Sequence, residues 1–181
     1  MLGIMFLVLC FCILIVVAIY NNLVRLSNLV KNAFSSIDVM LKRRYDLIPN
    51  LVETVKTYMN YEESVLKRIT ELRVEATQSN ISIDEKVKID NDISSNMSKI
   101  FALSEGYPDL KANESFLKLQ TATIDVENEI SAARRSFNSS ATEYNINISV
   151  FPNNIFVHLF EFKEISLFKT DDIENVIIKL R

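Results

Sequence analysis

The stretch IDVMLKRRYDLIPNLVETVKTYMNYE, residues 37–62, predicts where the chain folds back on itself. Its basic residues Lys42, Arg43 and Arg44 are typical of a last helical turn, where cations stabilise the negative end of the helix dipole. Asp46 is a suitable N-cap for a following helix, and Pro49 then falls in the first turn, where a missing N–H costs no hydrogen bond. We therefore predict a tight corner at residues 44–46 that joins two long helices.

Apolar residues recur at steps of three and four on both sides of this corner, which indicates amphipathic helices. Only 2 Gly and 3 Pro occur in 181 residues, so the chain has few turn residues and favours long helices. Short connections between long helices give antiparallel neighbours. The predicted fold is all-α, an antiparallel up-and-down four-helix bundle. Its first helix ends near residue 44, and the other three cover residues 46–77, 84–104 and 110–148.

The first 20 residues carry no charged side chain, and about 20 apolar residues suffice to cross a bilayer as a helix. We predict a retained transmembrane anchor rather than a cleaved signal peptide, because no Lys or Arg precedes the apolar run. Arg25 and Lys31 follow it, so the positive-inside rule predicts an external N-terminus and a cytoplasmic soluble domain. Cys10 and Cys12 both lie in this span, which leaves no cysteine for a disulfide or thiol site elsewhere.

Three parts are expected: an anchor at 1–20, the bundle at 21–150, and an aromatic and amphipathic tail at 151–181. About 36 Å of helix would separate Tyr20 from Arg44, so both corners, 44–46 and 105–109, are predicted at the end of the bundle far from the bilayer. We interpret the basic run there as helix-end electrostatics, paired with Glu105 or Asp109. The alternative is a docking surface for a partner, formed by Lys42, Arg43, Arg44, Tyr45, Asp46, Tyr107 and Asp109.

The tail has two interpretations, because it concentrates large apolar side chains in a segment with few charges. Either it lies against the bilayer as an interfacial segment, or it packs on the bundle as a flap. Further on, Asp171 is a candidate cap for a short helix, and residues 176–180 fit a short strand equally well. The candidate membrane-contact residues are Phe151, Ile155, Phe156, Leu159, Phe160 and Phe162.

The side chains show no catalytic constellation, and we predict no catalytic, cofactor-binding or metal-binding residue and no small-molecule substrate. His158 is the one histidine and is interpreted as a polar tip in an aromatic segment. The net charge of −3 gives no basic field for nucleic acid. The favoured function is a non-enzymatic membrane scaffold that presents its bundle to a protein partner or to copies of itself. The alternative is a membrane-remodelling protein that uses the aromatic tail.

The chain resembles the LemA family of bacterial membrane proteins. The resemblance rests on YNNLVRLSNLVKNAFSSIDVMLKRRYDLIPNLVETVKTYMNYE at 20–62, YPDLKANESFLKLQ at 107–120, ARRSFN at 133–138 and FPNNIF at 151–156. It implies a transmembrane helix followed by a largely α-helical domain of antiparallel, four-helix type in a bacterial cell membrane, with no established activity, cofactor or substrate. Some relatives are associated with specialised membrane compartments. This chain departs from the family where Glu161 stands at a place that often holds Gly.

Overall fold

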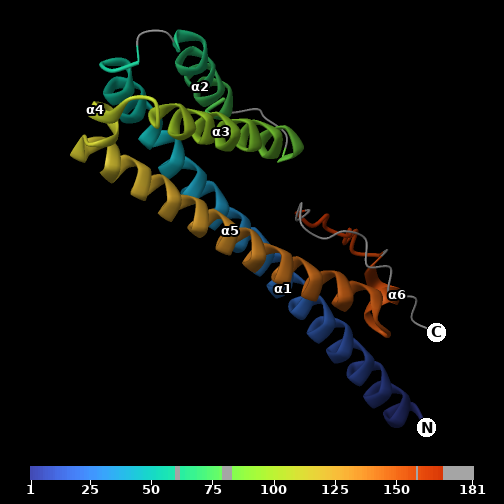
Figure 1. The fold of residues 1–181 in the computed structure, drawn as a ribbon. Helices are drawn as coiled ribbons and strands as arrows, with labels where there is room; N and C mark the ends of the chain where they lie inside the picture. Colours follow the sequence, from blue (N-terminus) through green and yellow to red (C-terminus); the bar gives the residue numbers. More distant parts are fainter. Residues whose placement is uncertain (60–61, 79–82, 158, 169–181) are drawn as a thin grey trace, which may run out of the picture. The chain divides into compact units, whose positions relative to one another are not determined.

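The computed structural model describes residues 1–59, 62–78, 83–157 and 159–168. Every regular element in these ranges is a helix, so the all-α prediction is confirmed (Figure 1). The helices are α1 (Leu2–Lys56), α2 (Glu63–Ala76), α3 (Ile83–Ser104), α4 (Pro108–Lys111), α5 (Glu114–Ser149) and α6 (Asn153–Val157). The predicted short helix or strand beyond residue 168 lies outside the described residues, as does His158.

The predicted corner at residues 44–46 is wrong, because α1 continues through it and through Pro49 to Lys56. Proline cannot donate the helical bond from residue 49 to the carbonyl of Tyr45. That carbonyl instead accepts a hydrogen bond of 3.0 Å from Nε of Arg73 on α2. The predicted second helix is therefore divided between the end of α1 and the separate helix α2.

The turn predicted at residues 105–109 is present, and it separates α3 from the single turn of α4. The predicted fourth helix begins later than expected, since Ala112 and Asn113 are not helical and separate α4 from α5. Asn113 caps α5 by accepting a hydrogen bond of 3.0 Å from the backbone N–H of Phe116. The structure does not confirm the up-and-down four-helix order.

The helices divide into two compact units, and α1 and α5 contribute to both. Unit 1 comprises residues 1–36 and 132–181, and unit 2 comprises residues 37–131. The proposed boundaries at residues 20 and 150 remain predictions.

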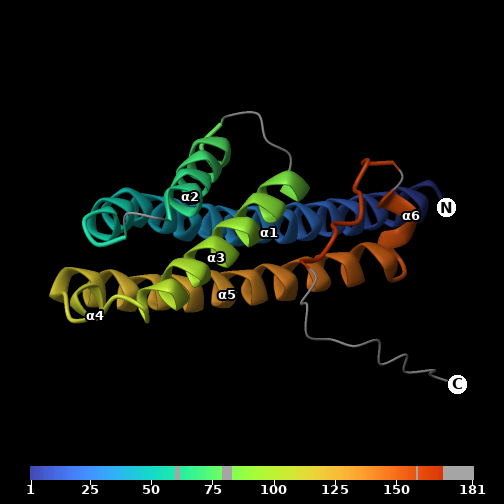
Figure 2. The ribbon, with the colours of Figure 1, turned by 45° about the horizontal axis from the view of Figure 1, so that its top comes forward.

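In unit 2 the α1 and α5 segments run antiparallel. Arg43 on α1 pairs with Glu129 on α5, and Tyr58, just after the end of α1, accepts a hydrogen bond of 3.1 Å from Asn113, which lies just before α5. Helices α2 and α3 form a hairpin, and α3 crosses over the α1 and α5 segments of unit 2 (Figure 2). The core is built from apolar residues at steps of three and four: Ile37, Leu41, Ile48, Leu51, Val55, Leu66, Ile69, Leu72, Ile93, Met97, Ile100, Phe116, Val126 and Ile130.

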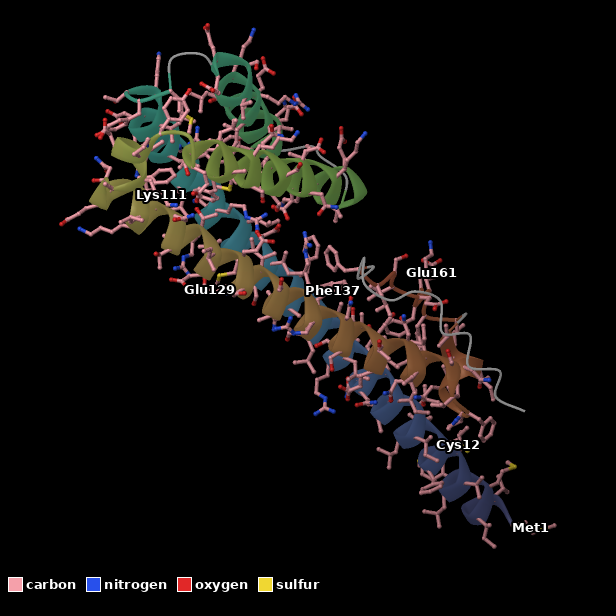
Figure 3. All side chains as sticks on the ribbon, in the orientation of Figure 1. Met1, Cys12, Lys111, Glu129, Phe137 and Glu161 are labelled. Carbon is pink, nitrogen blue, oxygen red and sulfur yellow. The ribbon has the colours of Figure 1, made fainter. Side chains whose placement is uncertain are left out.

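In unit 1 the α1 and α5 segments are again antiparallel. The rings of Phe34 and Phe137 lie 5.9 Å apart, and Asn22 contacts Asn147. The N-terminal end of α1 is long and apolar enough to cross a membrane, and its 18-residue window of mean hydropathy 3.3 has no buried residue. Figure 3 labels Met1 and Cys12 on this exposed end. The apolar N-terminal helix is thus consistent with membrane anchoring.

Candidate functional site

Arg44 lies inside α1, not at a helix end as predicted, and belongs to a buried ion cluster in unit 2. The Arg44 side chain is fully buried, and its Nη1 donates to Oδ1 of Asp90 at 2.6 Å and to Oγ of Ser94 at 2.8 Å. Its Nη2 pairs with the half-exposed carboxylate of Glu127. Glu105, one of the two partners expected at the 105–109 turn, pairs instead with Lys111 at 2.5 Å. Because a buried guanidinium needs anionic partners, the cluster fastens α1 to α3 and α5.

The other predicted docking residues lie in different surroundings. Lys42, Arg43 and Asp46 are exposed, whereas Tyr45 is only 4% exposed. Asp109 is exposed on α4. Tyr107 donates its hydroxyl to both carboxylate oxygens of Glu62, at 2.9 and 3.0 Å, and so ties the turn before α4 to the start of α2. The structure thus brings Arg44 and Tyr45 into the core and leaves the rest of the set accessible or partly accessible.

One cavity of about 350 Å³ lies between α3 and α5 in unit 2. Its walls combine apolar and polar groups, and Glu127 of the ion cluster and Ser94 belong to them. The wall side chains include neither histidine nor cysteine, and the described residues contain no group of three His, Cys, Asp or Glu arranged to hold a metal ion. The cavity wall offers the carboxylate of Glu127 and the hydroxyl groups of Ser94, Ser98 and Thr123.

The aromatic tail in unit 1 is divided between packed and exposed side chains. Phe160 and Phe162 pack against Tyr20, with ring centroids 4.9 and 6.1 Å away. Phe151 is 78% exposed, and the two other exposed members, Ile155 and Leu159, are 59% and 71% exposed. Phe156 is intermediate. Since Tyr20 is the last residue of the predicted anchor, Phe160 and Phe162 place this part of the tail beside the base of the candidate membrane span.

Beyond α6 the tail turns back beside α5, where Figure 3 labels Glu161 and Phe137. We call residues 162–168 the strap. Asn138 and Asn145 on α5 each bind the backbone of one strap residue through both the amide N–H₂ and the carbonyl oxygen. Tyr144 lies between them, and burial raises the pKa of its hydroxyl, while a hydrogen bond from the Lys163 backbone partly offsets the rise.

Sequence reasoning missed two features that depend on partners distant in the chain. Arg44 shares the seven-residue spacing of the buried positions Leu23, Val30, Ile37 and Leu51, so a charge in that register is the signal that a buried partner exists. Asn138 and Asn145 are also seven residues apart, which places two amides on one face of α5. Neither spacing identifies the residues with which Arg44 or the two asparagines interact.

Comparison with known proteins finds relatives that are similar in sequence over most of this chain. The sequence is 32% identical over 158 residues to Protein LemA of Metamycoplasma hominis, covering 86% of this chain and 71% of that protein. It is 22% identical over 175 residues to Magnetosome protein MamQ 1 of Paramagnetospirillum magneticum, covering 83% of this chain and 64% of that protein. It is 23% identical over 174 residues to Magnetosome protein MamQ of Magnetospirillum gryphiswaldense, covering 82% of this chain and 64% of that protein.

The chain thus spans just under two thirds of the MamQ proteins. Neither name denotes an enzyme. The apolar N-terminal helix and these relatives together indicate a membrane-associated protein. The sequence pattern of the LemA family matches residues 33–180. This chain belongs to the LemA family.

Proposed function

We propose that this chain is a non-enzymatic, single-pass membrane protein whose α6 region contacts the bilayer surface beside the anchor. The observation that carries the proposal is the exposed group Phe151, Ile155 and Leu159, placed next to the packed contacts of Phe160 and Phe162 with Tyr20. Burying one large apolar side chain yields about 1.5–3 kcal/mol, so three of them provide a substantial gain at the interface.

The orientation follows from the charges that flank the anchor. Arg25 and Lys31 are the first basic residues after it, which supports a cytoplasmic domain and an external N-terminus. In this arrangement unit 2 is presented to the cytoplasm as an interaction module for a protein partner or a second copy. Its exposed charges Lys42, Arg43, Asp46 and Asp109 are the candidate docking residues.

A membrane-organising role is the second candidate, because the same exposed apolar group would insert shallowly and displace lipid headgroups. The similarity to relatives named magnetosome proteins supports this role. Both candidates require contact between the α6 region and the bilayer. They differ in whether a protein partner is needed.

Tryptophan scanning tests the bilayer contact directly, because the chain contains no Trp and each introduced indole is the sole reporter. Full-length Ile155→Trp and Leu159→Trp are reconstituted into vesicles of brominated lipid. We expect strong quenching of both. The matched control is Leu29→Trp, which is 46% exposed on α1 and about 13 Å along the helix from Tyr20. Quenching no greater at 155 and 159 than at 29 would refute the contact.

Cross-linking in native membranes separates the two candidate roles. A scaffold should yield a stable cross-linked partner or oligomer that is lost when Lys42 and Arg43 are both changed to Glu. A membrane-organising protein should instead deform vesicles when it is the only protein present. The orientation is checked with Asn32→Cys, which a membrane-impermeant maleimide should label only after the cells are opened.

A further inference from the structure

The hydrogen bonds that hold the strap on α5 join asparagine side chains of α5 to backbone groups of the strap, not to its side chains. Asn145 Nδ2 donates to the carbonyl of Ile165 at 2.8 Å, and Asn145 Oδ1 accepts from the N–H of the same residue at 3.0 Å. Asn138 repeats both bonds with Phe168, each at 2.9 Å. The two asparagines therefore make the paired contacts that a neighbouring β-strand would make with an extended segment.

The spacing of the two asparagines matches the repeat of an extended chain. Seven residues of α-helix rise about 10.5 Å, and three residues of extended chain span about 10 Å. The step from Asn138 to Asn145 thus equals the step from Phe168 to Ile165. Any extended segment that runs antiparallel to α5 can satisfy this pair of amides.

Side-chain contacts then select the occupant. The ring of Phe168 lies edge-on to Phe137 with centroids 5.1 Å apart, and the guanidinium of Arg134 lies 5.7 Å from the same ring. The surface therefore fits an extended segment with an apolar residue followed three positions later by an aromatic residue. A second copy of this chain has the same sequence and therefore contains such a segment, at Ile165 and Phe168.

The closed arrangement contains local backbone strain immediately before the strap. Glu161 has φ = 56°, in the left-handed region that disfavours residues with a side chain. This is the turn that sends the strap back along its own α5. A strap that passes to a neighbouring copy makes these same contacts with the α5 of that copy and no longer needs this turn.

We propose that the α5 surface around Asn138 and Asn145 is an interface between two copies of this chain, which exchange their straps. Strain at Glu161 favours the exchanged form. The exchanged and closed forms share the same α5 contacts, so they differ mainly in the hinge and in the cost of association. This interface does not depend on contact between the α6 region and lipid.

Photo-cross-linking of the full chain tests the exchange. Phe168→p-benzoylphenylalanine places the reactive ketone against Phe137 and Arg134. Protein labelled with ¹⁵N is mixed with unlabelled protein in detergent, reconstituted together into vesicles and irradiated. Exchange predicts cross-linked peptides in which the strap and α5 carry different isotopes. Cross-links that join only strap and α5 of the same isotope would overturn the proposal.

Two variants test the two parts of the interface. Glu161→Gly removes the strain of the closed turn, so the share of mixed-isotope cross-links should fall about fivefold; an unchanged share would overturn the proposal. The double variant Asn138→Ala, Asn145→Ala should lose the cross-links of both isotopic kinds to α5. Mixed-isotope cross-links that persist at the same α5 sites would also overturn it. Asn128→Ala, an exposed α5 position, is the matched control and should leave both kinds unchanged.

Discussion

Arg73 on α2 donates its Nε–H to the backbone carbonyl of Tyr45 on α1 at 3.0 Å. This carbonyl is the one that Pro49, four residues later, leaves without a helical donor. Proline inside a helix removes a hydrogen bond and normally kinks or ends the helix. The side chain of a second helix here supplies a donor, and α1 continues to Lys56.

We expect Arg73→Met to lower the free energy of unfolding by about 1–2 kcal/mol, because a buried carbonyl loses its donor. Pro49→Ala restores a backbone N–H for the same carbonyl, so Arg73→Met should cost less in the Pro49→Ala background. Denaturant unfolding of the four proteins in detergent gives the coupling energy. Arg68→Met, at an exposed position of the same helix, serves as control and should change stability by less than about 0.5 kcal/mol. Equal costs of Arg73→Met in both backgrounds would exclude this role.

The Arg44 cluster should respond asymmetrically to substitution. Arg44→Met leaves the buried carboxylate of Asp90 without its guanidinium, so we expect a loss of about 3–5 kcal/mol. Adding Asp90→Leu should recover much of this loss, since an apolar pair often replaces a buried ion pair at little cost. The adjacent Arg43→Met is the control, because Arg43 is 54% exposed and should contribute at most about 1 kcal/mol. Thermal unfolding followed by circular dichroism measures all three.

The two asparagines of α5 should protect separate strap amides from hydrogen exchange. Asn145→Ala removes the acceptor of the Ile165 N–H, and Asn138→Ala removes that of the Phe168 N–H. A hydrogen bond of about 1 kcal/mol corresponds to roughly fivefold faster exchange at the affected amide. Exchange measured by mass spectrometry should rise first at the residue facing the substituted asparagine. A uniform rise over all helices would instead indicate global destabilisation.

Tyr144 should make stability fall in alkaline solution. Burial raises the pKa of its hydroxyl above the ordinary 10.0, so the folded chain holds this proton after the unfolded chain has released it. The unfolded state binds fewer protons in that window, and stability therefore falls as the pH rises above about 10 and up to the folded pKa. Tyr144→Phe removes this contribution. The difference in unfolding free energy between the variant and the parent, measured from about pH 8 to about pH 11, should move in favour of the variant. Parallel curves would contradict the assignment.

Local patterns in the sequence were sufficient for the helical class and for much of the core. Residues at steps of three and four, from Leu23 to Val55 on α1, are buried as the amphipathic pattern predicts. The turn at Gly106 and the apolar N-terminal helix are equally local, because each depends on residues adjacent in the chain. The place that often holds Gly in the family, Glu161 here, does adopt a left-handed conformation.

Only the tertiary structure decided where α1 ends, what Arg44 does and how the tail is held. Pro49 and the basic run are ordinary helix-end signals when they are considered alone, and Arg73 and Asp90 reverse that interpretation from distant positions. Asn138 and Asn145 acquire their role only when the strap lies beside them. The physical reason is the same in each case. Apolar burial follows the periodicity of the chain itself, whereas a buried carbonyl, charge or amide is stabilised only by the partner that the fold brings to it.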